Sequence, residues 1–298
     1  MSDDTAAGTA EVEARLAAGH AAADVLVEAL PYIRRFRGAT VVVKYGGNAM
    51  VDPALADRFA EDVVLLQAVG LRPVVVHGGG PQIGDLMARL GKASSRRPAG
   101  HRRRDARHRS HGAVREGQPR DRVRHQRAPI AVGLSGEDAG LIVADVRDPA
   151  LGYVGDVREV NPAIVERLLA EELIPVISTI GSDESGQAYN INADTVAGAI
   201  AAALGAEKLV YLTDVAGLLR DIDDPSTLIT RVSAAELRVL VDDEVISGGM
   251  IPKVDSCLDA IDRGVPAVHL LDGRIPHVLL LELFTDAGVG TMITRWSP

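Results

Sequence analysis

Residues 40–47 read TVVVKYGG, and residues 73–81 read PVVVHGGGP. Each stretch is a short run rich in β-branched residues that stops at a glycine turn, and a helix-like apolar pattern follows each turn. A buried strand, a glycine turn and a helix, repeated twice in succession, predict an α/β protein. Its sheet should be mainly parallel, with helices on both faces.

The same alternation of strands and helices extends along the chain. An amphipathic helix is expected from Val12 to Phe36, with a kink or restart at Pro31 because proline lacks the backbone N–H. Further strands are predicted at residues 141–145, 153–160, 174–178, 208–212, 267–271 and 291–294, and further helices at 53–69, 81–90, 162–172, 193–204, 234–240, 252–263 and 277–284.

Composition indicates a globular protein. The 298 residues are 47% hydrophobic and 24% charged, which suits one large α/β domain or two lobes around a cleft. No apolar run is long enough to span a membrane and the first residues lack a signal pattern, so a cytoplasmic location is expected. Cys257 is the single cysteine, which excludes an intrachain disulfide and favours a small buried side chain.

The net charge of −9 conceals a basic segment. Residues 93–129 contain 12 arginines and three acidic residues, no lysine, and almost no large apolar side chain. The rest of the chain is correspondingly acidic. A stretch of this composition cannot contribute an ordinary core face.

Two glycine turns are candidates for binding anions. The carboxyl ends of parallel strands line one crevice, where the following helices point unpaired N–H groups. Gly46 and Gly47 follow the first strand, and Gly78, Gly79 and Gly80 follow the second. Neither turn matches a standard nucleotide fingerprint, so each one alone is also consistent with an ordinary tight turn.

Two lysines follow the same logic. Lys44 ends the first strand, and Lys253 lies where the glycine loop 248–249 leads into a helix with Pro252 in its first turn. Either lysine alone could be a surface residue. Together they supply the fixed positive charge that phosphoryl transfer between two anions requires.

Residues 190–194 read NINAD and precede an alanine-rich helix. Asn192 is a natural N-cap and Asp194 suits the first helical turn, so capping alone explains much of this motif. The functional alternative is that Asn190 contacts a small substrate while Asp194 holds the two ammonium groups. A third turn at Thr213, Asp214 and Gly217 is a candidate for facing a nucleotide.

Taken in order, seven segments resemble the amino acid kinase family, in its branch that phosphorylates N-acetyl-L-glutamate. They are VVVKYGGNAM, VVVHGGGPQI, VGLSGEDAGL, NINADTVA, YLTDVAGLL, GGMIPKVDSCLDAI and LLELFTDAGVGT. The resemblance implies a three-layer αβα sandwich. It also implies ATP-dependent phosphorylation, with Mg²⁺, of the γ-carboxylate of N-acetyl-L-glutamate in arginine biosynthesis.

The resemblance also implies roles for individual residues. Lys44 and Lys253 would stabilise the transferring phosphoryl group, and Asp194 would orient them. Backbone N–H groups would come from Gly46, Gly47 and Gly79, contacts to the acyl amino acid from Gly79, Gly80 and Asn190, and the nucleotide loop from Thr213, Asp214 and Gly217. The implied division is a helical extension (1–39), an acyl-amino-acid lobe (40–205) and a nucleotide lobe (206–298).

The basic segment departs from the family pattern. Where the family has a G-x-R-V-T stretch that grips the substrate carboxylate, this chain has Gly100, His101 and Arg102, then more arginine. Read one base later, the codons of residues 108–128 permit IARMVLFGKVNREIVSAINAH, an amphipathic helical sequence. We hypothesise a frame-shifted reading, and we predict weak or absent activity for the chain as written, with Arg102 as a weak candidate for the carboxylate contact.

Two other functions remain open on the sequence. A related amino acid kinase acting on aspartate, glutamate or carbamate would carry similar phosphoryl machinery. A nucleic-acid-binding protein would use the arginine-rich stretch, although that stretch has no aromatic residues for stacking.

Regulation is suggested by the long first helix together with His269, Glu282 and residues 288–290, GVG. These features resemble the arginine-inhibited, hexameric members of the family. The alternative is a helix that only packs on its own subunit, in a dimer that does not respond to arginine.

Overall fold

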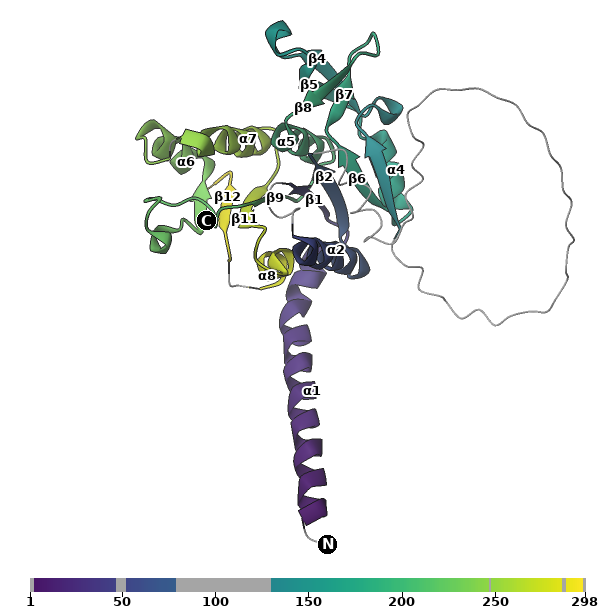
Figure 1. Ribbon diagram of the computed structural model, residues 1–298, viewed down its shortest axis with the longest axis vertical. Coiled ribbons are helices and arrows are strands. Elements are labelled where there is room, and N and C mark those ends of the chain that lie inside the picture. The colour runs from purple at the N-terminus through teal and green to yellow at the C-terminus, as the bar shows by residue number, and fades with distance from the viewer. Residues whose placement is uncertain (1–2, 47–51, 79–129, 247, 286–287, 297–298) are drawn as a thin grey trace, which may run out of the picture.

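The computed structural model describes residues 3–46, 52–78, 130–246, 248–285 and 288–296. Eight strands form one sheet in the order β10-β12-β11-β9-β1-β2-β6-β3 (Figure 1). Neighbouring strands are parallel except for the pair β11 and β12. The strands are β1 (Thr40–Tyr45), β2 (Arg72–His77), β3 (Ala131–Ser135), β6 (Ile174–Ser178), β9 (Lys208–Thr213), β10 (Arg231–Ser233), β11 (Ala267–Asp272) and β12 (Thr291–Thr294).

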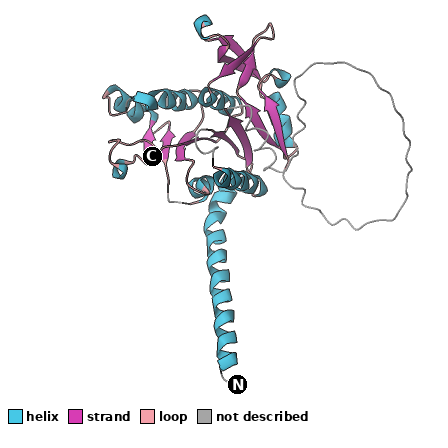
Figure 2. Cartoon of the chain, in the orientation of Figure 1, coloured by secondary structure: helices cyan, strands magenta, loops and turns pink. Residues whose placement is uncertain are grey.

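Helices cover both faces of this sheet, as predicted (Figures 1 and 2). On one face lie α5 (Ala193–Ala203), α6 (Ala234–Asp242) and α7 (Ile251–Asp262), and α4 (Ala163–Ala170) packs against β6. On the other face lie α2 (Pro53–Ala68) and α8 (Val278–Phe284). The three-layer αβα arrangement expected from the sequence is confirmed. Short 3-10 turns occur at Asp138–Gly140, Pro149–Leu151, Pro225–Thr227 and Gly248–Met250.

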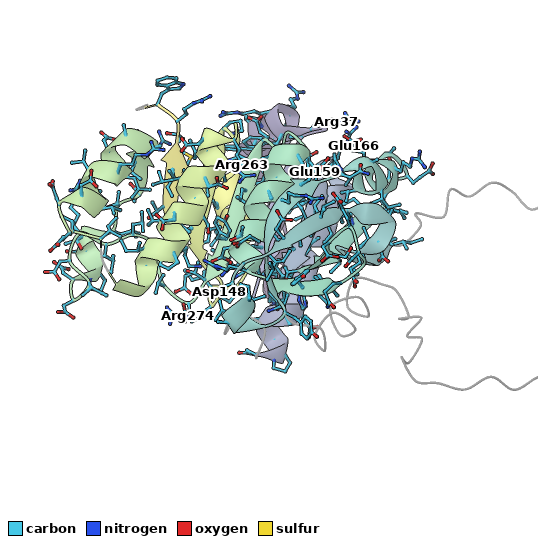
Figure 3. All side chains as sticks on the ribbon, turned by 90° about the horizontal axis from the view of Figure 1, so that it is seen from above. Arg37, Asp148, Glu159, Glu166, Arg263 and Arg274 are labelled. Atoms are coloured by element: carbon cyan, nitrogen blue, oxygen red, sulfur yellow. The ribbon has the colours of Figure 1, made fainter. Side chains whose placement is uncertain are left out.

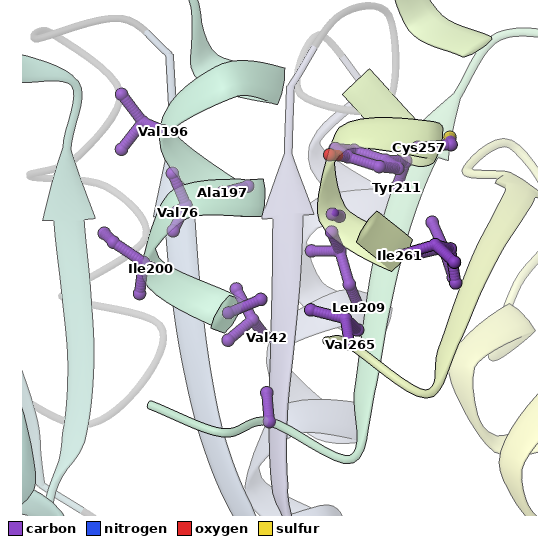
Figure 4. Packing of buried hydrophobic residues seen from close by; sticks show 14 of the residues in the cluster. Val42, Val76, Val196, Ala197, Ile200, Leu209, Tyr211, Cys257, Ile261 and Val265 are labelled. Carbon is purple, nitrogen blue, oxygen red and sulfur yellow. The ribbon is translucent and has the colours of Figure 1, made fainter. Parts of the chain in front are cut away.

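The alternation of side chains along β1 separates two cores. Val42 faces α5 and α7, where it joins Val196, Ile200, Tyr211 and neighbouring residues (Figure 4). Val41, Val43 and Tyr45 face α2 and α8 and join the second core. Lys44, next to Tyr45 in a pleated strand, therefore lies on the α5 and α7 face. Charged side chains such as Glu166 on α4 and Arg263 after α7 project from the outer surface (Figure 3).

The first helix, α1 (Asp3–Phe36), extends away from the body of the molecule (Figure 1). The restart expected at Pro31 as one alternative is wrong, since a single helix continues through it. Pro31 removes only the hydrogen bond to the carbonyl of Val27, and the Val27 side chain is exposed, so water is available to that part of the helix. Phe36 at its end is buried in the second core, whereas Leu16, Val25 and Leu26 are exposed.

A second, smaller sheet closes on itself beside the main one. It contains β4 (Ile142–Val146), β5 (Val154–Val160), β7 (Ile180–Ser182) and β8 (Ala188–Ile191). The first two strands agree with the sequence prediction to within one residue at either end. The other two, together with β3 and β10, were missed because each is short and β7 and β8 lack a continuous β-branched run.

The remaining predicted elements agree with the structure to within about two residues at each end, the usual uncertainty of such boundaries. The helix expected over 81–90 lies outside the described residues, as does the arginine-rich segment 93–129. No described helix combines the length and apolar character that crossing a membrane requires.

Candidate active site

Two lysines from distant parts of the chain meet at one carboxylate. Lys44 Nζ lies 3.0 Å from Oδ1 of Asp194, and Lys253 Nζ lies 2.9 Å from Oδ2. All three side chains are mostly buried, with exposed fractions of 13%, 20% and 15% for Lys44, Lys253 and Asp194. The convergence expected from the sequence is therefore present in the structure.

The start of α5 fixes Asp194. Asn192 caps this helix, because its Oδ1 accepts hydrogen bonds from the backbone N–H groups of Asp194 at 2.8 Å and Thr195 at 3.3 Å. Asp194 lies in the first turn, where the helix dipole favours a negative charge. Capping and the candidate function thus coexist in the NINAD motif: Asn192 makes the cap and Asp194 is left to hold the lysines.

The charge balance explains the protonation state of Asp194. Burial by itself would raise its pKa, but the attraction of Lys44 and Lys253 outweighs burial and holds the pKa below the usual value. Asp194 is therefore ionised at neutral pH. Two lysines share one carboxylate, so the three side chains together carry an excess of positive charge.

Tyr211 supports this arrangement and was missed in the sequence. Its hydroxyl donates to the backbone carbonyl of Asp194 at 3.0 Å, and its ring centroid lies 5.9 Å from Lys253 Nζ. No pattern in the sequence marked it, because only the strand register of the folded protein places it on β9 directly opposite Lys44 on β1.

The described residues of the two glycine turns lie at the same edge of the main sheet as Lys44 and Asp194. Gly46 is buried after β1. Gly78 follows β2 and approaches α5 so closely that an added Cβ would lie 3.1 Å from Ala193 Cβ. The glycine therefore allows β2 to end beside the first turn of α5. Gly47, Gly79 and Gly80 lie outside the described residues.

Asn190 lies on β8, two residues before the cap of α5. Its backbone N–H donates to the Tyr153 carbonyl at 2.9 Å, and its side chain is exposed. The small sheet thus carries Asn190 to the neighbourhood of Asp194, as a substrate contact would require.

The third turn also lies at this edge, because β9 pairs with β1. The Thr213 hydroxyl is used within the protein: its single proton is shared between the Val215 carbonyl at 2.8 Å and the Leu271 carbonyl at 3.2 Å. Asp214 is exposed. Gly217 is buried with φ +149°, and an added Cβ would lie 2.6 Å from Thr291 Oγ1. Thr213 and Gly217 therefore shape the loop, and Asp214 is available for contacts outside it.

The residues singled out for regulation form a separate buried cluster. His269 Nδ1 lies 2.7 Å from Glu282 Oε1, and Lys208 Nζ lies 3.0 Å from His269 Nε2. Glu282 also accepts the Val289 backbone N–H at 3.1 Å, and Lys208 Nζ lies 5.0 Å from the centre of the Phe36 ring at the end of α1. Burial lowers the pKa of Lys208 to about 8 and also lowers the pKa of His269.

Among the described residues, no group of three or more histidine, cysteine, aspartate or glutamate side chains is arranged to hold a metal ion.

Comparison with known proteins gives a consistent family. The sequence profile of the amino acid kinase family matches residues 39–272. An acetylglutamate kinase from a Nostoc species is 49% identical, over 90% of this chain and 92% of its own length.

Solved structures agree. N-acetylglutamate synthase from Neisseria gonorrhoeae, in complex with coenzyme A and L-arginine, superposes with a TM-score of 0.67 at 27% identity. The match covers 92% of this chain and 66% of that protein. Carbamate kinase from Giardia has a TM-score of 0.58 at 16% identity, over 87% of this chain and 99% of its own, and so agrees in fold alone.

Proposed function

We infer that this chain, which belongs to the amino acid kinase family, transfers a phosphoryl group from ATP to the γ-carboxylate of N-acetyl-L-glutamate, a step of arginine biosynthesis. Its near-full-length similarity to acetylglutamate kinases supports this substrate over aspartate, glutamate or carbamate. Nucleic-acid binding through the arginine-rich stretch finds no support in these relatives.

The observation that carries the mechanism is the sharing of Asp194 by Lys44 and Lys253. In phosphoryl transfer, negative charge is spread over the equatorial oxygens while the attacking and leaving oxygens stay in line. We propose that the two ammonium groups stabilise this charge and that Asp194 sets their spacing. The attacking carboxylate is already ionised, so the reaction needs no general base.

The other residues have supporting roles in this proposal. Backbone N–H groups of Gly46, Gly47 and Gly79 would bind phosphoryl oxygens. Gly79, Gly80 and Asn190 would position the acyl amino acid, and residues 213–217, with Thr213, Asp214 and Gly217, would face the nucleotide. Residues 40–205 would form the acyl-amino-acid lobe, residues 206–298 the nucleotide lobe, and residues 1–39 a helical extension.

Magnesium would arrive with ATP. Mg²⁺ is commonly held by substrate phosphates and water with few protein ligands, which fits the lack of a metal cluster among the described residues. We place the enzyme in the cytoplasm, where ATP and its biosynthetic substrate occur.

The direct test is an assay of ADP release with ATP, Mg²⁺ and each acceptor in turn: N-acetyl-L-glutamate, glutamate, aspartate and carbamate. We expect turnover with the acetylated substrate alone. The assay should compare the chain as written with a restored chain in which residues 108–128 are replaced by IARMVLFGKVNREIVSAINAH. Turnover of another acceptor, or of none by either chain, would overturn the proposal.

Arginine inhibition is a second proposal, favoured by the cluster of Lys208, His269 and Glu282 beside the end of α1. Exposed apolar side chains on α1, such as Val25 and Leu26, support its use in assembly. We expect a hexamer whose activity falls on addition of arginine. Light scattering and assays with and without arginine test this, and an arginine-insensitive dimer would contradict it.

A further inference from the structure

The part of the chain before β9 and the part after it, which we call the two halves, meet again on the face of the sheet opposite the lysines. Asp62 on α2 and His277 at the start of α8 are 215 residues apart in sequence, yet Oδ1 of Asp62 and Nδ1 of His277 lie 2.6 Å apart. The Asp62 side chain is 2% exposed, whereas that of His277 is 39% exposed. This is therefore a carboxylate buried in one half of the chain with its side-chain partner in the other.

Asp62 also supplies the cap that α8 lacks. His277 occupies the N-cap position of α8 with a left-handed backbone, φ 57°, and makes no side-chain capping bond. The Asp62 carboxylate instead accepts the backbone N–H of Leu279 in the first turn of α8. A residue of α2 thus satisfies a helix terminus that belongs to the C-terminal part of the chain.

The contact lies directly behind the strand that carries Lys44. Tyr45, the next residue, stacks on Phe59 of α2 with ring centroids 4.0 Å apart, and both rings line one small cavity with Asp62 and His277. On the opposite face, Asp194 of α5 binds Lys253 of α7. The junction of β1 and β9 is therefore held on both faces by a carboxylate from the first half of the chain.

We propose that Asp62 and His277 form a positioning clasp that keeps the two halves closed, so that Lys44 and Lys253 stay on the same carboxylate. The clasp rests on the function proposed above, because its purpose is to maintain the spacing of the lysines during phosphoryl transfer. Neither residue touches the reacting groups. A small change in that spacing is enough to slow a transfer that depends on alignment.

The groups around Asp62 make the clasp sensitive to pH. His277 and the N–H of Leu279 face it from α8, Glu61 is its neighbour on α2, and Arg58 and Tyr45 line the same cavity. Burial raises the pKa of Asp62 to about 6, although the bonds from His277 and Leu279 oppose this rise. Below that pH the carboxyl group becomes neutral and its hold on His277 weakens.

Lysine acetylation gives a test that does not depend on turnover. The chain contains only four lysines, at positions 44, 92, 208 and 253. We would treat the full-length protein with an acetylating reagent at about pH 8, where Asp62 is ionised, and follow each lysine by mass spectrometry. A lysine-containing model peptide added to the same reaction is the reference, because Lys208 contacts α8 through His269 and Glu282 and is not independent of the clasp.

In Asp62→Leu, the leucine side chain has a shape similar to that of aspartate but has no oxygen to accept hydrogen bonds from His277 and Leu279. We expect Lys253 to be acetylated at least about fivefold faster than in the wild type, because the lysine is released from its partner. Asp62→Asn keeps an oxygen for Leu279 but has no charge for His277, and it should give a rate between those of the wild type and Asp62→Leu. Glu61→Gln, which removes an exposed carboxylate on the same helical turn, is the matched control and should equal the wild type.

Steady-state kinetics give a second readout. In the restored chain, Asp62→Leu should lower kcat about tenfold without changing KM for N-acetyl-L-glutamate. The ratio of wild-type to Asp62→Asn kcat should fall as the pH decreases through about 6, because only the wild type loses a charge there.

Rates for Lys44 and Lys253 within twofold of wild type in folded Asp62→Leu would overturn the clasp, whatever the kinase activity. If that variant does not fold, His277→Asn replaces it, since asparagine tolerates the left-handed backbone. Absence of kinase activity alongside the expected change in lysine reactivity would refute the proposed function and leave the clasp supported.

Discussion

Lys44 binds one oxygen of the Asp194 carboxylate, at 3.0 Å between Nζ and Oδ1, and leaves the other oxygen to Lys253. Each lysine therefore has a partner within the protein. A phosphoryl group entering this space would meet two ammonium groups already spaced by a common anion, so little rearrangement is needed when negative charge develops.

Replacing either lysine by methionine should lower kcat about 10²- to 10³-fold, with a much smaller change in KM, because the charge is needed most in the transition state. Initial rates of ADP release by the restored chain would measure this. Arg263→Gln, which removes an exposed cation just after α7, is the control and should retain full activity. A methionine variant within about threefold of wild type would contradict the assigned role.

Asp62 gives a prediction about stability with a definite sign. Folding raises its pKa from 3.8 to about 6, so the native state binds the proton more tightly than the unfolded state. This contribution to stability is present below pH 4 and is lost as the pH rises through about 6. Ionised Asp62 thus costs native stability at neutral pH, by up to about 3 kcal/mol.

Asp62→Asn should therefore be more stable than the wild type at about pH 7.5, and this advantage should shrink towards about pH 4. Urea unfolding of both proteins at the two pH values gives the difference directly, and effects of other groups cancel in it. An advantage that grows as the pH falls would show that Asp62 is stabilised in its ionised form. If Asp62→Leu is more stable than the wild type and yet its Lys253 is acetylated faster, unfolding cannot be the cause of the faster acetylation.

Cys257 provides a probe of the core between α7 and the sheet. It is fully buried beside Tyr211 and Ile261, and burial raises the pKa of its thiol, so almost no thiolate forms near neutral pH (Figure 4). We expect the native protein to resist a thiol reagent that reacts completely once guanidinium unfolds it. Since there is one cysteine, the extent of reaction reports one site. Rapid stoichiometric reaction in the native state would mean that this core opens readily.

The sequence predicted most strands of the main sheet because they are continuous apolar runs. All three side chains of the run at 41–43 are buried, although they point to alternate faces. In the small sheet it predicted β4 and β5 but missed β7 and β8. β8 is AYNI, in which only Ile191 is buried, so neither a continuous run nor an alternation stood out. Strands of this kind are specified by their partners β5 and β7 more than by their own residues.

The lysine pair was predictable because both residues adjoin glycine turns at strand or helix ends, where the fold places ligands. Tyr211, Asp62 and His277 were not. Each acts through a contact made across the sheet or between helices, and nothing in the local pattern of α2 distinguishes Asp62 from the exposed Glu61 beside it. Only the tertiary structure reveals that Asp62 is the buried one.

The arginine-rich segment yields the last prediction. As written, residues 108–128 contain six arginines, and their only large apolar side chains are Val114 and Val123, whereas the neighbouring-frame sequence is amphipathic. If a helix lining the substrate side is missing, turnover should be lost while the lysine pair remains, because Lys44, Asp194 and Lys253 come from other elements. We therefore expect the restored chain to exceed the chain as written by at least about 10²-fold in kcat/KM for N-acetyl-L-glutamate. Both chains should show the same slow acetylation of Lys253.

Sequencing the DNA over this interval decides the origin of the segment: codons that cannot encode the helix in a neighbouring frame exclude the frame-shift. Equal activity of the two chains would show that the segment, whatever its origin, does not contribute to the substrate site.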